Sequence, residues 1–420
     1  MAEPRVLRPA MPILFGAAAM LTLSMGIRQC FGLFVQPITR DLALTVSDFT
    51  LALSIQNLAW GFLQPVTGAL VVRLGFRPIL MGGAALYIAG LATLAGAHGM
   101  PGVVLGTGLL IGASLACTAS AMAQAAASRA VPASVRSMVL GLITGAGSLG
   151  ALAAAPIGQA VTAAFGWRAG VLAILVLALL LLPATWFAGR VDRIPVPRAT
   201  GEQIADVKAS AAIRVALGRA PFLVMAGAYF VCGMQLLFIT THLPSYLALC
   251  GIDPMLGAEA LGVIAVFNVF GSLFFGWAGG HWPKLVLLGA FYASRSLIIA
   301  WYFAAPPTPA TTLVFAALAG FLWLGVGPLI AGSVAEMFGL RWQAMIQGVA
   351  FMSHQFGSFV GAFGAGFLFD SLGSYDLAWK LGVGMGLTAG LVQIAAATAW
   401  RQPSTAGSTG AAAHGRQLRP

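Results

Sequence analysis

Residues 68–78 read GALVVRLGFRP, a short basic turn that begins with a glycine and separates two apolar runs. A second turn of the same kind, GWAGGHWPK, occupies residues 276–284, and Gly276 lies 208 positions beyond Gly68. Each turn follows an apolar run of helix length and precedes another. The recurrence predicts a chain built from two halves in which the segments are arranged in the same way.

The composition of the whole chain decides its environment. Of 420 residues, 59% are hydrophobic and only 8% are charged, whereas charged residues make up about 25% of a typical soluble domain. A soluble fold of this size could not remove so much apolar surface from water. We therefore expect an integral membrane protein.

Twelve apolar runs are long enough to cross a hydrocarbon core, which takes about 20 residues of helix. No run shows the alternation that a lipid-facing β-barrel requires. The sequence therefore predicts an all-α membrane protein with twelve transmembrane helices in two six-helix bundles. The runs lie at 11–36, 49–72, 78–97, 101–127, 137–163, 168–189, 221–248, 257–280, 284–304, 310–335, 343–369 and 377–400.

The longest polar connection follows the sixth run and divides the chain into two halves. It begins with a proline-containing stretch and continues into a predicted surface helix from about Thr200 to Leu217. The predicted organisation is an amino-terminal segment (1–10), a first six-helix bundle (11–189), a central loop (190–220), a second six-helix bundle (221–400) and a disordered tail (401–420).

Lys and Arg residues set the predicted orientation, because cytoplasmic connections of membrane proteins carry an excess of them. With the amino terminus in the cytoplasm, seventeen fall in cytoplasmic segments and only Arg40, Arg168 and Lys380 fall outside. The other two, Arg28 and Arg295, lie within apolar runs. We expect a protein of the inner (plasma) membrane with both termini in the cytoplasm. Because the basic residues lie in the connections between apolar runs, the net charge of +11 does not indicate a nucleic-acid partner.

Motifs of enzymes and metal sites are missing from the sequence. The four cysteines, Cys30, Cys117, Cys232 and Cys250, show no CxxC spacing, which argues against a disulfide framework or a metal site. No HExxH, GxSxG or Walker motif is present, and no carboxylates are paired within a span. We therefore expect no enzymatic activity and no cofactor.

The turn at 68–77 fits the pattern GxLxxRxGxR and resembles the signature loop between helices 2 and 3 of the major facilitator superfamily. Gly68, Arg73, Gly75 and Arg77 match this cytoplasmic gate motif, whereas Val72 replaces its usual acidic residue. The resemblance covers roughly residues 10–400, and we expect the protein to be a monomer.

A closer resemblance is to the bacterial monocarboxylate-transporter and oxalate/formate-antiporter branch of that superfamily. It implies two six-helix bundles that work by alternating access, and a substrate among the small organic carboxylates. The segments that carry it are GIRQCFGLFVQPI (26–38), IQNLAWGFLQPVTG (55–68), THLPSYL (241–247), FNVFGSLFFG (267–276), FYASRS (291–296) and SHQFGSFVGAFGAGFLFDSLGSY (353–375).

Arg28 is the leading candidate to bind such an anion. A guanidinium can hold a carboxylate through two parallel hydrogen bonds, and these are strong in a low dielectric. The resemblance implies the same role, because first-helix cations of the family stand at this place and help to bind substrate. The alternative is that Arg28 reaches toward the outer membrane interface while its stem stays among apolar groups.

Arg295 and His354 each have two interpretations. Arg295, in the ninth run, either contributes to substrate binding or pins its helix to neighbouring helices, with Tyr292 and Tyr302 on the same face. His354 and Gln355, in the eleventh run, resemble a place where carboxylate transporters put a polar or basic residue. His354 either exchanges a proton or packs as a hydrogen-bonded neutral side chain.

None of the eleven acidic residues lies in the middle of an apolar run. In eukaryotic-type relatives an acidic residue of helix 8 serves proton coupling, and Asn268 stands at the corresponding place. The coupling mechanism is therefore open among three alternatives: proton symport through His354, exchange of anions, and uniport. Asn57, Asn268 and Gln56 are further candidates for substrate binding, because helices 2 and 8 line the cavity in this fold.

Two rival functions have to be weighed against carboxylate transport. A facilitator that exports drugs or other metabolites would usually display an acidic residue within a span to bind cations, whereas this chain displays cations. A transporter-like sensor would need an output domain, and only a short tail follows Trp400. The sequence therefore favours a secondary active transporter of a small organic carboxylate.

Overall fold

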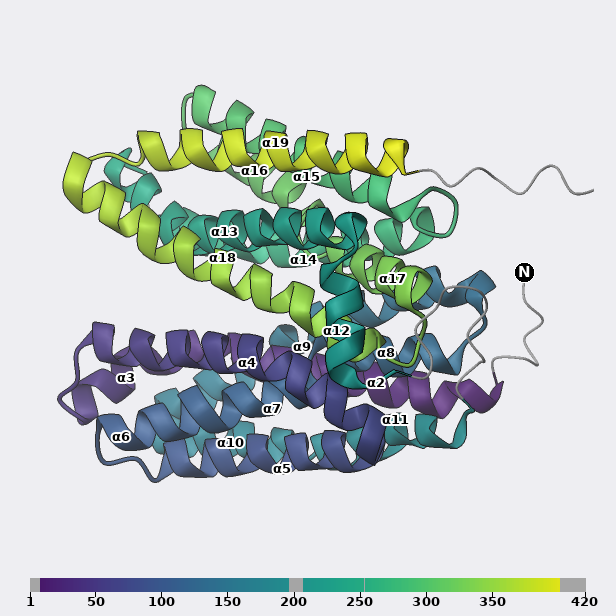
Figure 1. Ribbon diagram of the computed structural model, residues 1–420. Helices are drawn as coiled ribbons and strands as arrows, with labels where there is room; N and C mark the ends of the chain where they lie inside the picture. Colours follow the sequence, from purple (N-terminus) through teal and green to yellow (C-terminus); the bar gives the residue numbers. More distant parts are fainter. Residues whose placement is uncertain (1–7, 196–206, 253, 401–420) are drawn as a thin grey trace, which may run out of the picture.

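The computed structural model describes residues 8–195, 207–252 and 254–400, and helices account for nearly all of them, with no β-strand in these ranges. Figure 1 shows the helices in two stacked groups, one from the first half of the chain and one from the second half. We call them the first and the second bundle.

The first bundle begins with a short 3₁₀ turn, η1 (Arg8–Ala10), and ends with another, η3 (Gly189–Arg193). Between them lie α2 (Met11–Gln29), α3 (Phe31–Asp41), α4 (Val46–Leu74), α5 (Phe76–Ala95), α6 (Met100–Val103), the π-helical η2 (Val104–Leu110), α7 (Ile111–Thr118), α8 (Ser120–Ala130), α9 (Ala133–Phe165), α10 (Trp167–Ala178) and α11 (Leu181–Ala188).

The second bundle follows a surface helix, α12 (Ala209–Leu217). The sequence predicts this helix from about residue 200, and residues 200–206 of the predicted helix lie outside the described ranges. The bundle consists of α13 (Ala220–Leu249), α14 (Pro254–Ala278), α15 (Lys284–Ala304), α16 (Pro309–Phe321), α17 (Val326–Phe338), α18 (Gln343–Leu372) and α19 (Asp376–Ala399).

Ten helical segments of the described chain are long and apolar enough to cross a membrane. α4 and α18, at 29 and 30 residues, are also long enough but are not among these ten. Both carry several amide side chains, including Gln56 and Gln64 in α4 and Gln347 and Gln355 in α18, which lower their apolar content. With these two helices the described chain has the twelve spans that the sequence predicts.

Several predicted spans are interrupted rather than continuous. The first consists of α2 and α3, which meet at Cys30, and the fourth is broken at Ala119, where the backbone is extended. The tenth consists of α16 and α17, which are separated by residues 322–325. Hydrophobic length alone predicts that a segment crosses the membrane, but it does not reveal such breaks.

Close contacts between the bundles lie mainly toward one end of the molecule. We call it the basic end, and it contains the turns at residues 75, 131–132 and 339–342. A Cβ atom at Gly68 of α4 would lie 2.5 Å from the Cα of Met345 in α18, so only glycine permits this approach. A Cβ atom at Gly141 of α9 would lie 2.7 Å from the Cα of Gly276 in α14. The glycines that open the two repeated turns therefore both lie where the bundles touch.

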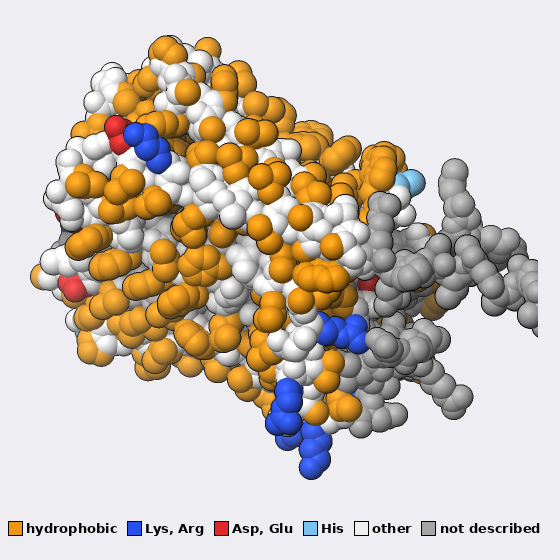
Figure 2. All heavy atoms as spheres, turned by 45° about the horizontal axis from the view of Figure 1, so that its top comes forward, with side chains coloured by type: hydrophobic (Ala, Val, Ile, Leu, Met, Phe, Trp, Pro, Cys, Tyr) orange, Lys and Arg blue, Asp and Glu red, His pale blue; other side chains and the backbone are white. Residues whose placement is uncertain are grey.

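The opposite end, which we call the far end, contains the turns at residues 42–45, 96–99 and 373–375. Figure 1 shows α4 and α18 diverging toward this end, where α3 and α6 lie. On the face shown in Figure 2, hydrophobic side chains cover the middle, and charged side chains lie near the two ends. This banding matches the interior of a bilayer between two aqueous interfaces.

The start of α4 at the far end is fixed by a capping box. The backbone N–H of Thr45 donates to the Asp48 carboxylate at 2.9 Å, and the backbone N–H of Asp48 donates to the Thr45 hydroxyl at 3.1 Å. The hydrogen bonds from the backbone and the hydroxyl of Thr45 hold the pKa of the Asp48 carboxyl below its usual range.

Candidate substrate-binding site

Arg28 lies near the end of α2, two residues before the break at Cys30, and is half-buried. Its Nη2 donates to the Oδ1 of Asn57 in α4 at 2.6 Å, and its guanidinium carbon lies 5.4 Å from the ring centroid of Trp60. Its Nε is buried without an acceptor, and no carboxylate among the described residues pairs with it. Among the described residues, the guanidinium of Arg28 therefore has one neutral hydrogen-bond acceptor, one aromatic ring beside it and no carboxylate partner.

Asn57 connects this arginine to the second bundle. The Nε2 of Gln355 in α18 donates to the backbone carbonyl of Asn57 at 3.0 Å. Gly61, one turn further along α4, allows the approach, because a Cβ atom there would lie 2.8 Å from the Cβ of Gln355. Arg28, Asn57 and Gln355 therefore meet at the level where the bundles part.

His354 lies beside Gln355 but points among aromatic side chains. The residue is 7% exposed, and its ring lies 4.5 Å from the Tyr229 ring and stacks on the Phe351 ring at 5.5 Å. Its Nδ1 lies 3.3 Å from the Oε1 of Gln355 and 3.5 Å from the hydroxyl of Ser358. The side chain is thus enclosed by α13 and α18, and Gln355 links it to the site of Arg28.

Arg295 of α15 is fully buried inside the second bundle. Its Nε donates to the Oε1 of Gln235 at 3.0 Å and its Nη1 to the sulfur of Cys232 at 3.3 Å, both in α13. Its guanidinium carbon lies 5.7 Å from the Tyr292 ring, as helical spacing predicts, whereas the Tyr302 hydroxyl pairs with Thr312.

Two polar groups of the Arg295 region lack partners. The Nη2 of Arg295 and the hydroxyl of Tyr292 are buried without a hydrogen bond, and no described carboxylate pairs with this arginine. Within the described ranges, Arg28 and Arg295 are therefore both intramembrane guanidiniums without a carboxylate partner, the first between the bundles and the second within the second bundle.

The other predicted ligands lie elsewhere. The Nε2 of Gln56 donates to the backbone carbonyl of Thr107 at 2.8 Å, so this amide points into the first bundle. The Nδ2 of Asn268 donates to the Ser148 hydroxyl at 2.6 Å, and its Oδ1 accepts the backbone N–H of Leu324 at 2.8 Å. Asn268 therefore joins the two bundles through α9 and is not bonded to Arg28.

The gate motif lies at the basic end and contains a contact that sequence patterns miss. Gly75 has a positive φ of 89° and begins the turn into α5, where the backbone N–H groups of Phe76 and Arg77 both donate to the Asp192 carboxylate at 2.8 Å. Arg77 stacks on Trp186 at 4.2 Å, and Arg73 is exposed. Asp192 thus brings a carboxylate to the turn in which Val72 replaces the usual acidic residue.

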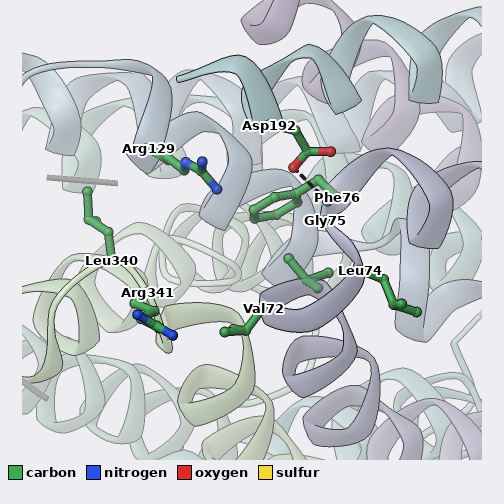
Figure 3. A pocket seen from close by; sticks show the side chains of 9 residues that line it. Val72, Leu74, Gly75, Phe76, Arg129, Asp192, Leu340 and Arg341 are labelled. Carbon is green, nitrogen blue, oxygen red and sulfur yellow. Dashed lines mark hydrogen bonds between the residues drawn. The ribbon is translucent and has the colours of Figure 1, made fainter. Parts of the chain in front are cut away.

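A cavity of about 340 Å³ adjoins this turn. Figure 3 shows Arg129 of the first bundle and Arg341 of the second bundle on its walls, together with Val72 and Phe76. The guanidinium of Arg129 donates to the backbone carbonyl of Ile194. The gate motif therefore lies directly at the boundary between the bundles.

The family profile of the Major Facilitator Superfamily matches residues 14–362. The chain belongs to the Major Facilitator Superfamily. As a secondary transporter of this superfamily it is not an enzyme; it is a multi-pass membrane protein with a small-molecule substrate.

Curated relatives and solved structures agree with this assignment. Monocarboxylate transporter 13 of Rattus norvegicus is 27% identical over 366 residues, which cover 84% of this chain and 81% of the relative. Monocarboxylate transporter 11 of Mus musculus is 28% identical over 378 residues, which cover 86% of this chain and 81% of the relative.

The crystal structure of FucP, a Major Facilitator Superfamily transporter in the outward conformation, superimposes with a TM-score of 0.69 at 16% identity. The match covers 92% of this chain and 99% of FucP. At this level of identity the likeness establishes the major facilitator fold.

Proposed function

We propose that this transporter moves a small organic carboxylate across the inner (plasma) membrane by alternating access. The observation that carries the proposal is the guanidinium of Arg28, which lies between the bundles without a carboxylate partner among the described residues. An ionised group within a membrane span is costly and is usually retained for function. The carboxylate of the substrate would supply the missing negative charge.

The free hydrogen-bond donor of Arg28 supports this role. Its Nη2 is held by Asn57, which fixes the orientation of the planar guanidinium, while its Nε has no acceptor. A carboxylate that approached this edge would gain a charge-assisted hydrogen bond. The names of the two mammalian relatives, both monocarboxylate transporters, favour the same substrate class.

The contacts between the bundles support alternating access from an outward-facing state. They extend from the gate motif to Gln355 and Asn57, and the far-end halves of α4 and α18 diverge beyond this point. The basic end would be cytoplasmic by the distribution of Lys and Arg. Rocking of the bundles about the level of Arg28 would then expose the site to either side in turn.

The surroundings of His354 favour exchange of anions over proton symport. A protonated His354 would be a second buried cation near Arg295, enclosed by the rings of Tyr229 and Phe351 and without a carboxylate in contact. Such a charge is costly to bury. Asn268, which cannot titrate, uses both polar atoms in contacts within the protein.

Counter-transport in proteoliposomes tests the substrate class. Vesicles loaded with one unlabelled acid are assayed for uptake of labelled monocarboxylates and dicarboxylates, with a neutral sugar and an organic cation as comparisons. We expect accelerated uptake of at least one small carboxylate. Uptake of the cation alone would instead support a drug exporter, and an absence of transport for every compound would support a transporter-like sensor.

A further inference from the structure

The second bundle carries a groove on its surface between α13 and α19, away from the substrate site. The groove encloses about 580 Å³ and is lined by apolar or small side chains along most of its length, with Lys380 at one end. Leu381, Met385 and Val392 on its α19 wall are each more than a third exposed. In a membrane-embedded protein this surface faces the acyl chains of lipids.

Two glycines keep the groove open. Cβ atoms at Gly227 of α13 and Gly384 of α19 would find no atom within 4 Å. Gly390 of the same α19 differs, because a Cβ atom there would lie 2.7 Å from the backbone nitrogen of Ala293. Gly390 therefore serves helix packing, whereas Gly227 and Gly384 leave an unfilled space on the surface.

The groove is long enough to hold an extended acyl chain. From Lys380 to Val392 the α19 helix advances 12 residues, which is about 18 Å at 1.5 Å per residue. The hydrocarbon core of a bilayer is about 30 Å thick, so one leaflet contributes about 15 Å. Since α19 begins at Asp376, the groove starts close to the far-end interface. It runs past the membrane centre, because Val224 and Gly227 on its α13 wall lie near the basic-end start of α13 at Ala220.

Lys380 supplies a free positive charge at the interfacial end. Its side chain is exposed, and no carboxylate among the described residues lies within ion-pair distance of it, including Asp376 one helical turn earlier. An ammonium group at the membrane interface attracts the phosphate of a lipid headgroup. The charge and the apolar groove below it thus follow the order of groups in a phospholipid.

We propose that this groove binds one phospholipid, with an acyl chain along α13 and α19 and the headgroup phosphate at Lys380. The bound lipid would lie against the helix that also supplies Tyr229, the side chain packed on His354. The site is separate from the substrate site, since none of its lining residues is a hydrogen-bond partner of Arg28 or Arg295.

Native mass spectrometry of the purified full chain tests the proposal. The protein is delipidated in detergent and titrated with phosphatidylglycerol. We expect one retained lipid, and we expect Gly227→Leu combined with Gly384→Leu to weaken its retention at least tenfold by filling the groove. Gly82→Leu is the matched control, because Gly82 of α5 is also exposed and a Cβ atom there would find no atom within 4 Å; it should bind as the unmodified chain does.

Lys380→Gln tests the headgroup contact and should weaken lipid retention about fivefold. This factor corresponds to about 1 kcal/mol, the contribution of one basic residue at a charged lipid surface. Unchanged retention in the double glycine variant would overturn the proposal. A dimer mass that disappears in that variant would also overturn it and would assign the groove to a second copy of the chain.

Discussion

Arg28 and Arg295 are both arginines within membrane spans, yet their surroundings differ. Arg295 is fully buried, and its hydrogen bonds go to Gln235 and Cys232 of its own bundle. Arg28 is half-buried, and Asn57, its hydrogen-bond acceptor, also accepts from the opposite bundle through Gln355. We infer that Arg295 is a fixed structural charge and that Arg28 is a ligand-binding charge.

The comparison shows why an intramembrane charge does not identify a substrate site by itself. A guanidinium can be retained because neutral acceptors and rings enclose it, or because a ligand completes its hydrogen bonds. The distinguishing feature is whether its surroundings change during the transport cycle. Arg28 lies where the bundles must separate, whereas the α13 and α15 partners of Arg295 belong to one bundle.

Removal of the charge at Arg28 should have the largest effect. Arg28→Gln should reduce uptake of the carboxylate by about 100-fold or more, because a charged hydrogen-bonded contact of about 3 kcal/mol is lost. Arg28→Lys should retain part of the activity, since a single ammonium replaces the planar fork. Uptake in proteoliposomes at equal protein content measures both effects.

Membrane abundance and thermal stability of both Arg28 variants serve as controls. They should match the unmodified chain, since among the described residues Arg28 forms one side-chain hydrogen bond, to Asn57, and one ring contact, with Trp60. Uptake by Arg28→Gln with unchanged affinity would contradict the substrate role and would favour an arginine that reaches toward the interface.

Arg295→Gln should produce the reverse pattern. It leaves Gln235 without its guanidinium donor and should lower the free energy of unfolding by about 2 kcal/mol, with little change in the KM of uptake. Thermal unfolding in detergent and uptake kinetics separate the two effects.

A rise in KM in Arg295→Gln as large as that in Arg28→Gln would contradict this division. The second bundle would then contribute its own cation to the substrate site. The buried Nη2 of Arg295 is the atom that a substrate would have to reach in that case.

His354→Gln sharpens the comparison, because this side chain lies beside Gln355 of the Arg28 site and interacts electrostatically with Arg295. The variant retains a polar group but cannot titrate. Under the exchange hypothesis, anion-for-anion exchange should persist in the variant, and an imposed pH gradient should drive little uptake in the unmodified chain. Strong gradient-driven uptake that disappears only in His354→Gln would instead establish proton symport through this histidine.

The sequence predicts the twelve spans and the superfamily because hydrophobic length and the gate motif are local properties. It could not predict that Gln56 points to Thr107 within the first bundle, since helical spacing does not determine which face meets the partner bundle. The Arg28–Asn57 contact joins helices whose relative rotation is set by packing, so composition gives only the candidates. Sequence patterns do not reveal the contact of Asp192 with the gate turn, because Asp192 lies 116 positions after Phe76 and 115 positions after Arg77 in the chain.

The smallest effect is expected at the far end, where Asp48 lies on the surface outside both arginine environments. The pKa of the Asp48 carboxyl is lowered in the folded chain. The contribution of this carboxylate to stability is therefore present above the pKa of the unfolded chain, about 3.9. It is lost as the pH falls through the lower pKa of the folded chain. Asp48→Asn should therefore lower the Tm slightly at pH 7, and its Tm should converge with that of the unmodified chain as the pH falls below about 4. Thermal unfolding in detergent at several pH values measures this, and uptake at pH 7 should be unchanged. A loss of uptake comparable to that of Arg28→Gln would show that charge at the far end, and not only charge between the bundles, controls substrate entry.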